Sequence, residues 1–213
     1  MTAPITMNSV IHGAVRRDLD RLAAALAELP VGDTARAADL ARAYSYLCRE
    51  LHHHHEGEEA YVLPWMAAQG LALDLLPVME SEHAAMSAAV DETDAALQEL
   101  AADASAPRIA AARESVARTR AVVDTHLDHE ERDVVPAIVP HMESPGWKGV
   151  EKKLRARPAA DNGRFFAWIT DGMADEHRTY IRSTVPAPVV FVFGRVLGRG
   201  YRREVAPVWG RAT

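Results

Sequence analysis

The chain has 213 residues, of which 48% are hydrophobic and 25% charged, and its formal net charge is −6. These values are ordinary for one soluble domain, or for a domain with an appendage. The single cysteine, Cys48, excludes an internal disulfide, a thiolate cluster and an iron–sulfur site, and it fits a cytoplasmic location. We expect neither a signal peptide nor a membrane span, because no apolar run reaches about 18 residues.

Four successive stretches up to residue 144 have the pattern of amphipathic helices. Apolar side chains recur at spacings of three and four in residues 12–29, 40–65, 76–100 and 109–137. Loops of roughly three to eight residues between the stretches imply antiparallel neighbours. We therefore predict an all-α fold with an up-down-up-down four-helix bundle at residues 1–144. Pro64 and Pro136 would lie near the ends of their helices, where a kink or a break in the last turn is tolerated.

Two segments within the second and fourth stretches repeat each other. Residues 54–64 and 126–136 each carry a His, a Glu four positions later, a second Glu, an apolar pair and a final Pro. Positions i and i+4 share one helix face, about 6 Å apart along the axis. The repeat thus places an imidazole beside a carboxylate twice, which indicates a metal held between two helices.

The other two helices each contribute one more histidine to the same level of the bundle. Counted from the helix ends, all four histidines fall within about 5 Å of one height. Four imidazoles and two carboxylates in an apolar core would be costly unless something bound them. The predicted metal ligands are His12, His54, Glu58, His83, His126 and Glu130.

Several further histidines lie outside this set. In the run of four consecutive histidines, only His54 continues the seam of Leu47 and Leu51. We therefore expect its neighbours on the flank or surface, with one of them, His53, able to support the ligands indirectly. The remaining histidines are predicted to point off the seam or to be structural or exposed: His129, His141 and His177.

This arrangement resembles the hemerythrin-like (HHE cation-binding) family, of the actinobacterial type, over roughly residues 7–141. The resemblance implies two iron ions in an oxo- or hydroxo-bridged non-heme centre, with Glu58 and Glu130 bridging them. Imidazole and carboxylate ligands suit iron and do not exclude zinc or manganese. Ligating histidines usually donate their second N–H to an acceptor, for which Glu59, Glu80 and Glu131 are candidates.

The chain departs from the oxygen-carrying hemerythrins, which resemble it but have two histidines one turn apart on the third helix. Here Met79 and Ser87 lie four residues before and after His83, so the site is short of one imidazole. Water, a carboxylate or a tyrosine could fill that position. Tyr61, one turn beyond Glu58, is either close to the metals or a core aromatic.

The expected function follows from this ligand set. Fewer neutral and more anionic ligands favour the ferric state, which suits peroxide or nitric oxide chemistry better than oxygen carriage. We expect a peroxidase-like, catalase-like or nitric oxide peroxidase activity, with a small diatomic or peroxide ligand and an unknown electron donor. The alternative is a non-catalytic protein that binds, senses or stores oxygen or iron.

A ferritin-like di-iron bundle is a weaker alternative. Such bundles use Glu-x-x-His on two helices and a Glu on each of the others. Glu80-x2-His83 and Glu50-x2-His53 fit that pattern formally. The first helix, however, offers His12 in place of a glutamate.

The C-terminal region, residues 145–213, differs in charge from the rest. Residues 1–144 hold 11 Lys/Arg against 24 Asp/Glu, whereas residues 145–213 hold 13 against 6, with Ser144-Pro145-Gly146 as a joint. We predict a basic helical extension with helices at about 164–181 and 187–204. Its apolar face would cover the acidic bundle, which we favour, or contact an anionic membrane. Nothing in it indicates nucleic-acid binding.

Overall fold

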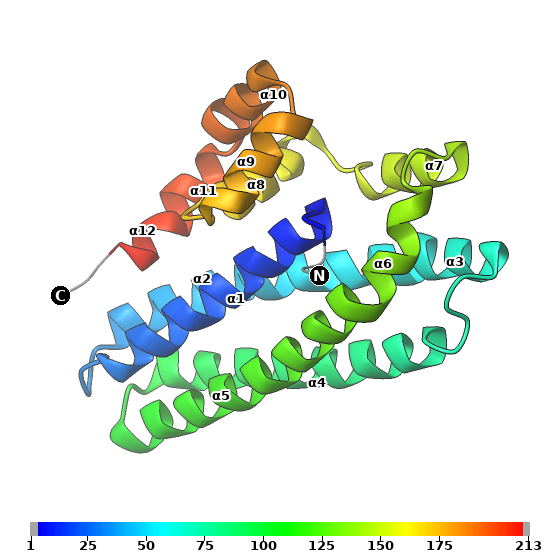
Figure 1. The fold of residues 1–213 in the computed structure, drawn as a ribbon. Helices are drawn as coiled ribbons and strands as arrows, with labels where there is room; N and C mark the ends of the chain where they lie inside the picture. Colours follow the sequence, from blue (N-terminus) through cyan, green and yellow to red (C-terminus); the bar gives the residue numbers. More distant parts are fainter. Residues whose placement is uncertain (1–3, 211–213) are drawn as a thin grey trace.

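The computed structural model describes residues 4–210, which form helices joined by short turns (Figure 1). The four-helix bundle consists of α1 (Met7–Ala27), α2 (Thr34–Gly57) continued by α3 (Leu63–Gln69), α4 (Leu76–Ala102), and α5 (Ala106–His129) continued by α6 (Val135–Ile138). α4 packs against both α2 and α5, and α1 packs against α5. No strand is assigned among the described residues. The predicted all-α bundle is confirmed.

Capping residues define where the bundle helices begin and end. Thr6 and Ser9 form a reciprocal capping box at the start of α1. At the start of α2, the Asp33 carboxylate accepts a hydrogen bond from the backbone N–H of Arg36. α4 and α5 each have a proline in the first turn, where the missing N–H costs nothing. Gly70 ends α3 with a φ of 69°, a left-handed conformation that glycine adopts readily.

Both repeated segments contain a π-helical turn, at Glu58–Val62 and at Glu130–Val134. In each, the residue after the turn donates its amide N–H to the carbonyl of the glutamate that begins it, five positions earlier. Pro64 and Pro136 follow directly. A proline inside an α-helix clashes with the carbonyl four residues before it, and a wider turn relieves that clash. The helices therefore continue through the prolines for a few residues, to Gln69 and Ile138, so both prolines lie near helix ends as predicted, with a π turn in place of a break.

The first π turn also moves the inward face of its helix by one position. After Glu58, the side chains of Val62 and Met66 are buried, whereas Tyr61 is exposed and Trp65 only half-buried. The regular spacing of an α-helix predicted the opposite assignment. One additional residue in the turn accounts for the difference.

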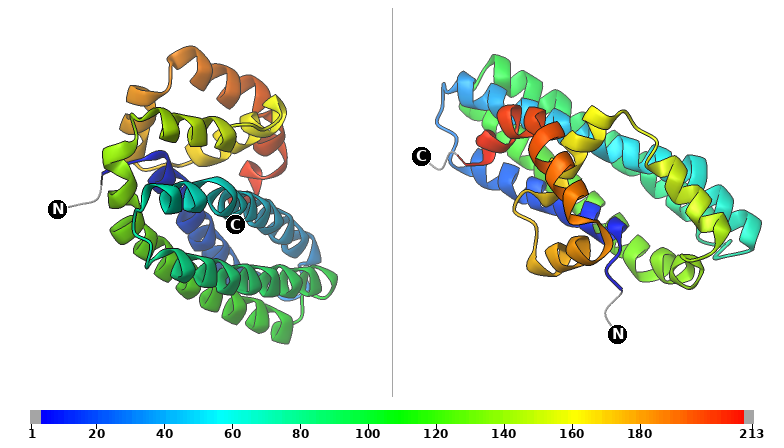
Figure 2. Two further views of the ribbon diagram at one scale, coloured as in Figure 1. Left: turned by 90° about the vertical axis from the view of Figure 1, so that its right-hand side faces the viewer. Right: turned by 90° about the horizontal axis from the view of Figure 1, so that it is seen from above.

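Residues 145–210 form a second group of helices that packs on the α1 and α2 side of the bundle (Figures 1 and 2). The helices are α7 (Pro145–Leu154), α8 (Ala159–Thr170), α9 (Asp175–Thr184), α10 (Ala187–Phe191), a π turn at Val192–Leu197, α11 (Arg199–Glu204) and α12 (Ala206–Trp209). The single helix predicted at about 164–181 is wrong, because Gly172, with a φ of 66°, separates α8 from α9. The helix predicted at 187–204 is likewise interrupted, at Gly198.

The bundle and the extension share one hydrophobic core. Trp168 of α8 is fully buried, and its indole N–H donates to Asp18 of α1 at 2.8 Å. Tyr201 of α11 is also fully buried and donates its hydroxyl to Asp171. Burying a large side chain of this kind contributes roughly 1.5–3 kcal/mol. The extension therefore covers one side of the bundle.

A helix that crosses a bilayer needs about 20 consecutive, predominantly apolar residues. Within residues 4–210, no helix is both long enough and apolar enough to cross a bilayer.

Candidate metal centre

Side chains from all four helical stretches of the bundle converge in its core and form what we call the central cluster. His12 comes from α1, two histidines and a glutamate from α2 and its π turn, His83 from α4, and the rest from α5 and its π turn. Six of them are buried and His54 is nearly so, with the side chains of His54 and Glu58 each 9% exposed. The cluster comprises the six predicted residues and one more: His12, His54, His55, Glu58, His83, His126 and Glu130.

One part of the cluster lies between α1, α2 and the α5 π turn. The Nε2 atom of His12 lies 3.3 Å from Nε2 of His54 and 3.2 Å from Oε2 of Glu130. The three ligand-type atoms of these residues lie within 4.8 Å of one another. A single cation between them could therefore be held by two imidazoles and a carboxylate.

The other part of the cluster lies between α2, α4 and α5. The rings of His55 and His83 stack with centroids 4.4 Å apart, and His126 meets His83 edge-on at 4.7 Å. Their ligand nitrogens also lie within 4.8 Å of one another. Three imidazoles gathered in this way could hold a second cation.

The two glutamates lie between these parts. Oε1 of Glu58 is 3.3 Å from Nε2 of His54, and its Oε2 is 3.5 Å from Nε2 of His83. Oε2 of Glu130 is 3.2 Å from Nε2 of His12 and 3.9 Å from Nε2 of His126. Each carboxylate therefore reaches a histidine from both parts, as a group shared by two cations would.

The expectation that His55 lies on the flank or surface is wrong. Its side chain is buried and belongs to the cluster. The inward stripe of a bundle helix is at least 100° wide, so adjacent residues can both face the core. The signal was present in the sequence, because Tyr44, Cys48, Leu51 and His55 follow one another at spacings of four, three and four, and all are buried.

Carboxylates outside the cluster orient three of its imidazoles. The Nδ1 atoms of His12, His83 and His126 lie 2.8–3.0 Å from carboxylate oxygens. Their partners are Glu131, Glu59 and Glu82, respectively. The prediction is therefore right for Glu59 and Glu131 and wrong for Glu80, because Glu82 takes that role. These contacts turn Nε2 of each ring toward the interior, as metal-ligating histidines require.

Four ligand-type atoms of the cluster have no hydrogen-bond partner among the described residues. They are Nε2 of His55 and His126 and Oε2 of Glu58 and Glu130, and the two carboxylate oxygens have only the ion-pair contacts with histidines given above. Each unsatisfied buried polar group costs about 1–3 kcal/mol. Cations placed among these atoms would satisfy all four, so the donor set fits metal ions.

Burial and mutual charge shift the pKa values of the cluster strongly. Burial, together with the charge of Glu130, raises the pKa of Glu58 well above its usual value. Burial would also raise the pKa of Glu130, but the neighbouring His12 charge holds it well below normal. Burial would lower the pKa of His12, yet the Glu130 carboxylate raises it. Burial and the charge of His12 lower the pKa of His54 to about 3. Without metal, these shifts favour a His12–Glu130 ion pair and the protonated form of Glu58.

Tyr61 is neither near the cluster nor in the core. It is 37% exposed, and its ring faces the ammonium group of Lys153, whose Nζ lies 5.3 Å from the ring centroid. Both interpretations of this tyrosine are wrong, because the π turn rotates it outward. Tyr61 is therefore not a candidate ligand of the metal centre.

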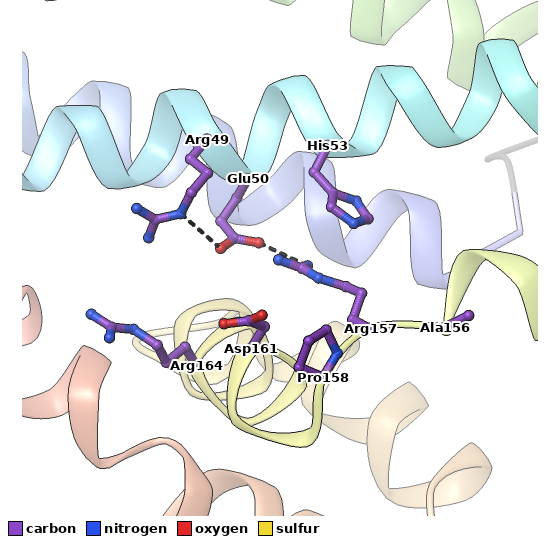
Figure 3. A pocket seen from close by; sticks show the side chains of 8 residues that line it. All are labelled: Arg49, Glu50, His53, Ala156, Arg157, Pro158, Asp161 and Arg164. Carbon is purple, nitrogen blue, oxygen red and sulfur yellow. Dashed lines mark hydrogen bonds and ion pairs between the residues drawn. The ribbon is translucent and has the colours of Figure 1, made fainter.

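The ferritin-like alternative is excluded by the positions of its glutamates. Glu50 is buried in an ion pair with Arg157 at 2.9 Å, beside a pocket between α2 and the start of α8. Figure 3 shows Glu50 and His53 pointing toward Arg157 in this pocket. His53 thus lines a separate pocket and does not support the cluster. Glu80 is exposed.

The other histidines behave largely as predicted. His52 is partly exposed and pairs with Asp91 at 3.1 Å. His129 points off the seam and contacts Asp133 at 3.3 Å, while its Nδ1 shares Glu82 with His126. The remaining two, His141 and His177, are partly exposed.

Comparison with known proteins gives one result. The sequence profile described as the Hemerythrin HHE cation binding domain matches residues 5–146, a stretch that contains the whole central cluster and both π turns. No curated protein and no solved structure gives a significant match. The profile does not distinguish an actinobacterial type, which stays an expectation.

Proposed function

This chain belongs to the hemerythrin HHE cation-binding family, and we propose that its cations are two iron ions held in the central cluster. The support is geometric, because five imidazoles and two carboxylates meet in one buried space and four of their atoms have no hydrogen-bond partner among the described residues. Oxygen and nitrogen donors without thiolates suit iron. Zinc and manganese remain alternatives for the same donors.

The ligands would divide unequally between the two ions. His55, His83 and His126 would hold one ion, and His12 with His54 would hold the other. The two glutamates reach both groups and would be shared. The ion beside His12 and His54 would thus have fewer protein donors and would retain a position for a small ligand.

We propose that this ligand is hydrogen peroxide or nitric oxide and that the protein consumes it. The observation that carries this proposal is the carboxylate on Nδ1 of His12, His83 and His126. Such partners make the imidazoles more basic and stabilise the higher oxidation state. Bound iron would supply one-electron exchange with oxygen or nitrogen species. The burial of the cluster, in which both glutamates are no more than 6% exposed, keeps out larger substrates and bulk water.

His55 removes one argument for this function and favours the alternative. The sequence left the site one imidazole short, but His55 provides a fifth. The number of imidazoles at the site therefore no longer favours peroxide chemistry over reversible oxygen binding. Reversible binding or sensing of oxygen, without turnover, is the second candidate function.

Stopped-flow spectroscopy of the iron-loaded protein, mixed with hydrogen peroxide and separately with nitric oxide, distinguishes the two. We expect turnover well above that of free iron, reduced in a Glu131→Gln variant, which weakens the acceptor on His12. Lys148→Gln, an exposed change on α7, serves as the control. Reversible oxygenation that bleaches without consuming either substrate would contradict the proposal and support the binding function.

A further inference from the structure

The outer face of α10 and the following π turn exposes a group of large apolar side chains. Val189, Phe191, Val192 and Val196 fall within eight residues, and Phe191 is 62% exposed. The other exposed large apolar residues of the described chain are spread over the α1–α2 turn and the bundle: Ile5, Val31, Tyr61, Leu73 and Val78. Figure 1 shows α10 at the end of the extension that lies away from α4 and α5. We call these four residues the apolar ridge.

The inner face of the same segment is already packed. Val190 and Phe193 contact the shared core. Gly163 of α8 lies so close to Leu197 that an added Cβ would collide with the leucine backbone. The segment is therefore fixed on α8 and presents the apolar ridge outward, while other apolar side chains of the extension cover the bundle.

The charge around the apolar ridge has one sign. Residues 177–203 contain six arginines and no Asp or Glu. Arg195, Arg199 and Arg203 are exposed, and no carboxylate within residues 4–210 lies at ion-pair distance from them. Unpaired arginines beside exposed apolar side chains complement a partner surface that has anionic groups on the outside and an apolar layer beneath them.

We propose that the apolar ridge and these arginines bind the surface of an anionic phospholipid membrane. The four side chains would enter the boundary between headgroups and acyl chains, and the arginines would contact lipid phosphates. Basic amphipathic helices with apolar residues on one face bind membranes in this way, and each arginine near an anionic surface contributes separately. A ridge that protrudes suits a fluid lipid surface better than the groove of a folded protein partner. This binding is independent of the metal centre.

Sedimentation of the full-length protein with vesicles tests the proposal. We expect binding to phosphatidylcholine vesicles containing about 30% phosphatidylserine, little binding to pure phosphatidylcholine, and release by added salt. Arg195→Gln with Arg199→Gln should weaken the partition coefficient about 30-fold. Phe191→Ser should weaken it about tenfold. The matched controls are Arg113→Gln on α5 and Val31→Ser, both exposed and far along the chain from the ridge.

A second measurement covers the case in which a variant fails to fold. A polarity-sensitive dye on Val192→Cys should shift its emission to shorter wavelength with anionic vesicles, whereas the same dye on Val31→Cys should not. Cys48 is buried and stays unlabelled. Equal binding to neutral and anionic vesicles, no vesicle binding, or an unchanged dye spectrum would each overturn the proposal. Binding to polyglutamate without binding to vesicles would also overturn it, in favour of an acidic protein partner.

Discussion

At the scale of single residues, His55 changes the composition of the metal centre. It follows His54 directly, yet the two rings serve different parts of the cluster, one beside His12 and the other stacked on His83. Residues 100° apart on a helix can face different neighbours in a bundle. The run of four histidines therefore contains two inward residues, not one.

We predict that His55→Ala impairs one of the two metal positions. Removing one of three clustered imidazoles should lower metal affinity there by at least about 10–100-fold, because even indirect partners of ligands have effects of that size. Isothermal titration with iron(II) under anaerobic conditions would measure it. His52→Ala, which changes a partly exposed neighbour, should leave both positions intact. Equal binding curves for the two variants would show that His55 is no ligand.

Metal binding should weaken as the pH falls. The raised pKa values of Glu58 and His12 mean that both retain protons in the metal-free protein, and a metal must displace them. His54, with its pKa lowered to about 3, has no proton to lose. Affinity should therefore fall as the pH is lowered, by up to about tenfold per pH unit for each displaced proton.

Zinc titrations against a competing chelator, with an indicator dye to count released protons, would check this. Glu58→Gln should release fewer protons on binding, since its amide carries none to displace. Affinity that does not depend on pH, with no protons released, would contradict the assignment of these groups as ligands.

At the scale of helices, the sequence predicted the inward face of the second stretch correctly only as far as Glu58. The spacing of apolar residues identifies the buried face of a helix as long as the helix stays regular. It correctly identified Leu47 and Leu51 as buried. At Glu58 the π turn adds a residue, and every later position turns toward a different neighbour. Pro64 was the signal of irregularity, but a proline alone does not reveal whether a helix ends, kinks or widens.

The contact between α8 and the π turn at Val192–Leu197 depends on Gly163. We predict that Gly163→Ala destabilises the protein by about 1–3 kcal/mol, because the new Cβ would meet Leu197 and overpacking has costs of that size. Urea unfolding followed by circular dichroism would measure the change. Gly149→Ala on α7, where no atom lies within 4 Å of the new Cβ, should be neutral or slightly stabilising. Similar results for both glycines would refute this account of the contact.

At the scale of the whole molecule, Asp18 joins the bundle to the extension. Its buried carboxylate accepts from Trp168 at 2.8 Å and pairs with Arg17 at 2.9 Å and Arg21 at 3.3 Å. Arg21 also pairs with Asp171 of the extension at 2.9 Å. The sequence showed the charge difference between the two parts, but it could not show which carboxylate lies under the extension. That depends on contacts between residues about 150 positions apart in the chain.

We predict that Asp18→Ala destabilises the protein by about 3–5 kcal/mol, because it leaves a buried indole N–H without its acceptor and removes a buried carboxylate that pairs with two guanidinium groups. Thermal unfolding would show the loss. Asp20→Ala, which removes an exposed ion pair with Arg120, should cost at most about 1 kcal/mol. A loss for Asp18→Ala no larger than that of Asp20→Ala would mean that this contact does not fasten the extension.

The whole account depends on two metal ions occupying the core of the bundle. The most direct measurement is anomalous diffraction at the iron edge from crystals of the iron-loaded protein. We predict two peaks, one beside His12 and His54 and one among His55, His83 and His126, with Glu58 and Glu130 touching both. A single peak at the protein surface, or an empty core in crystals that contain iron elsewhere, would contradict it.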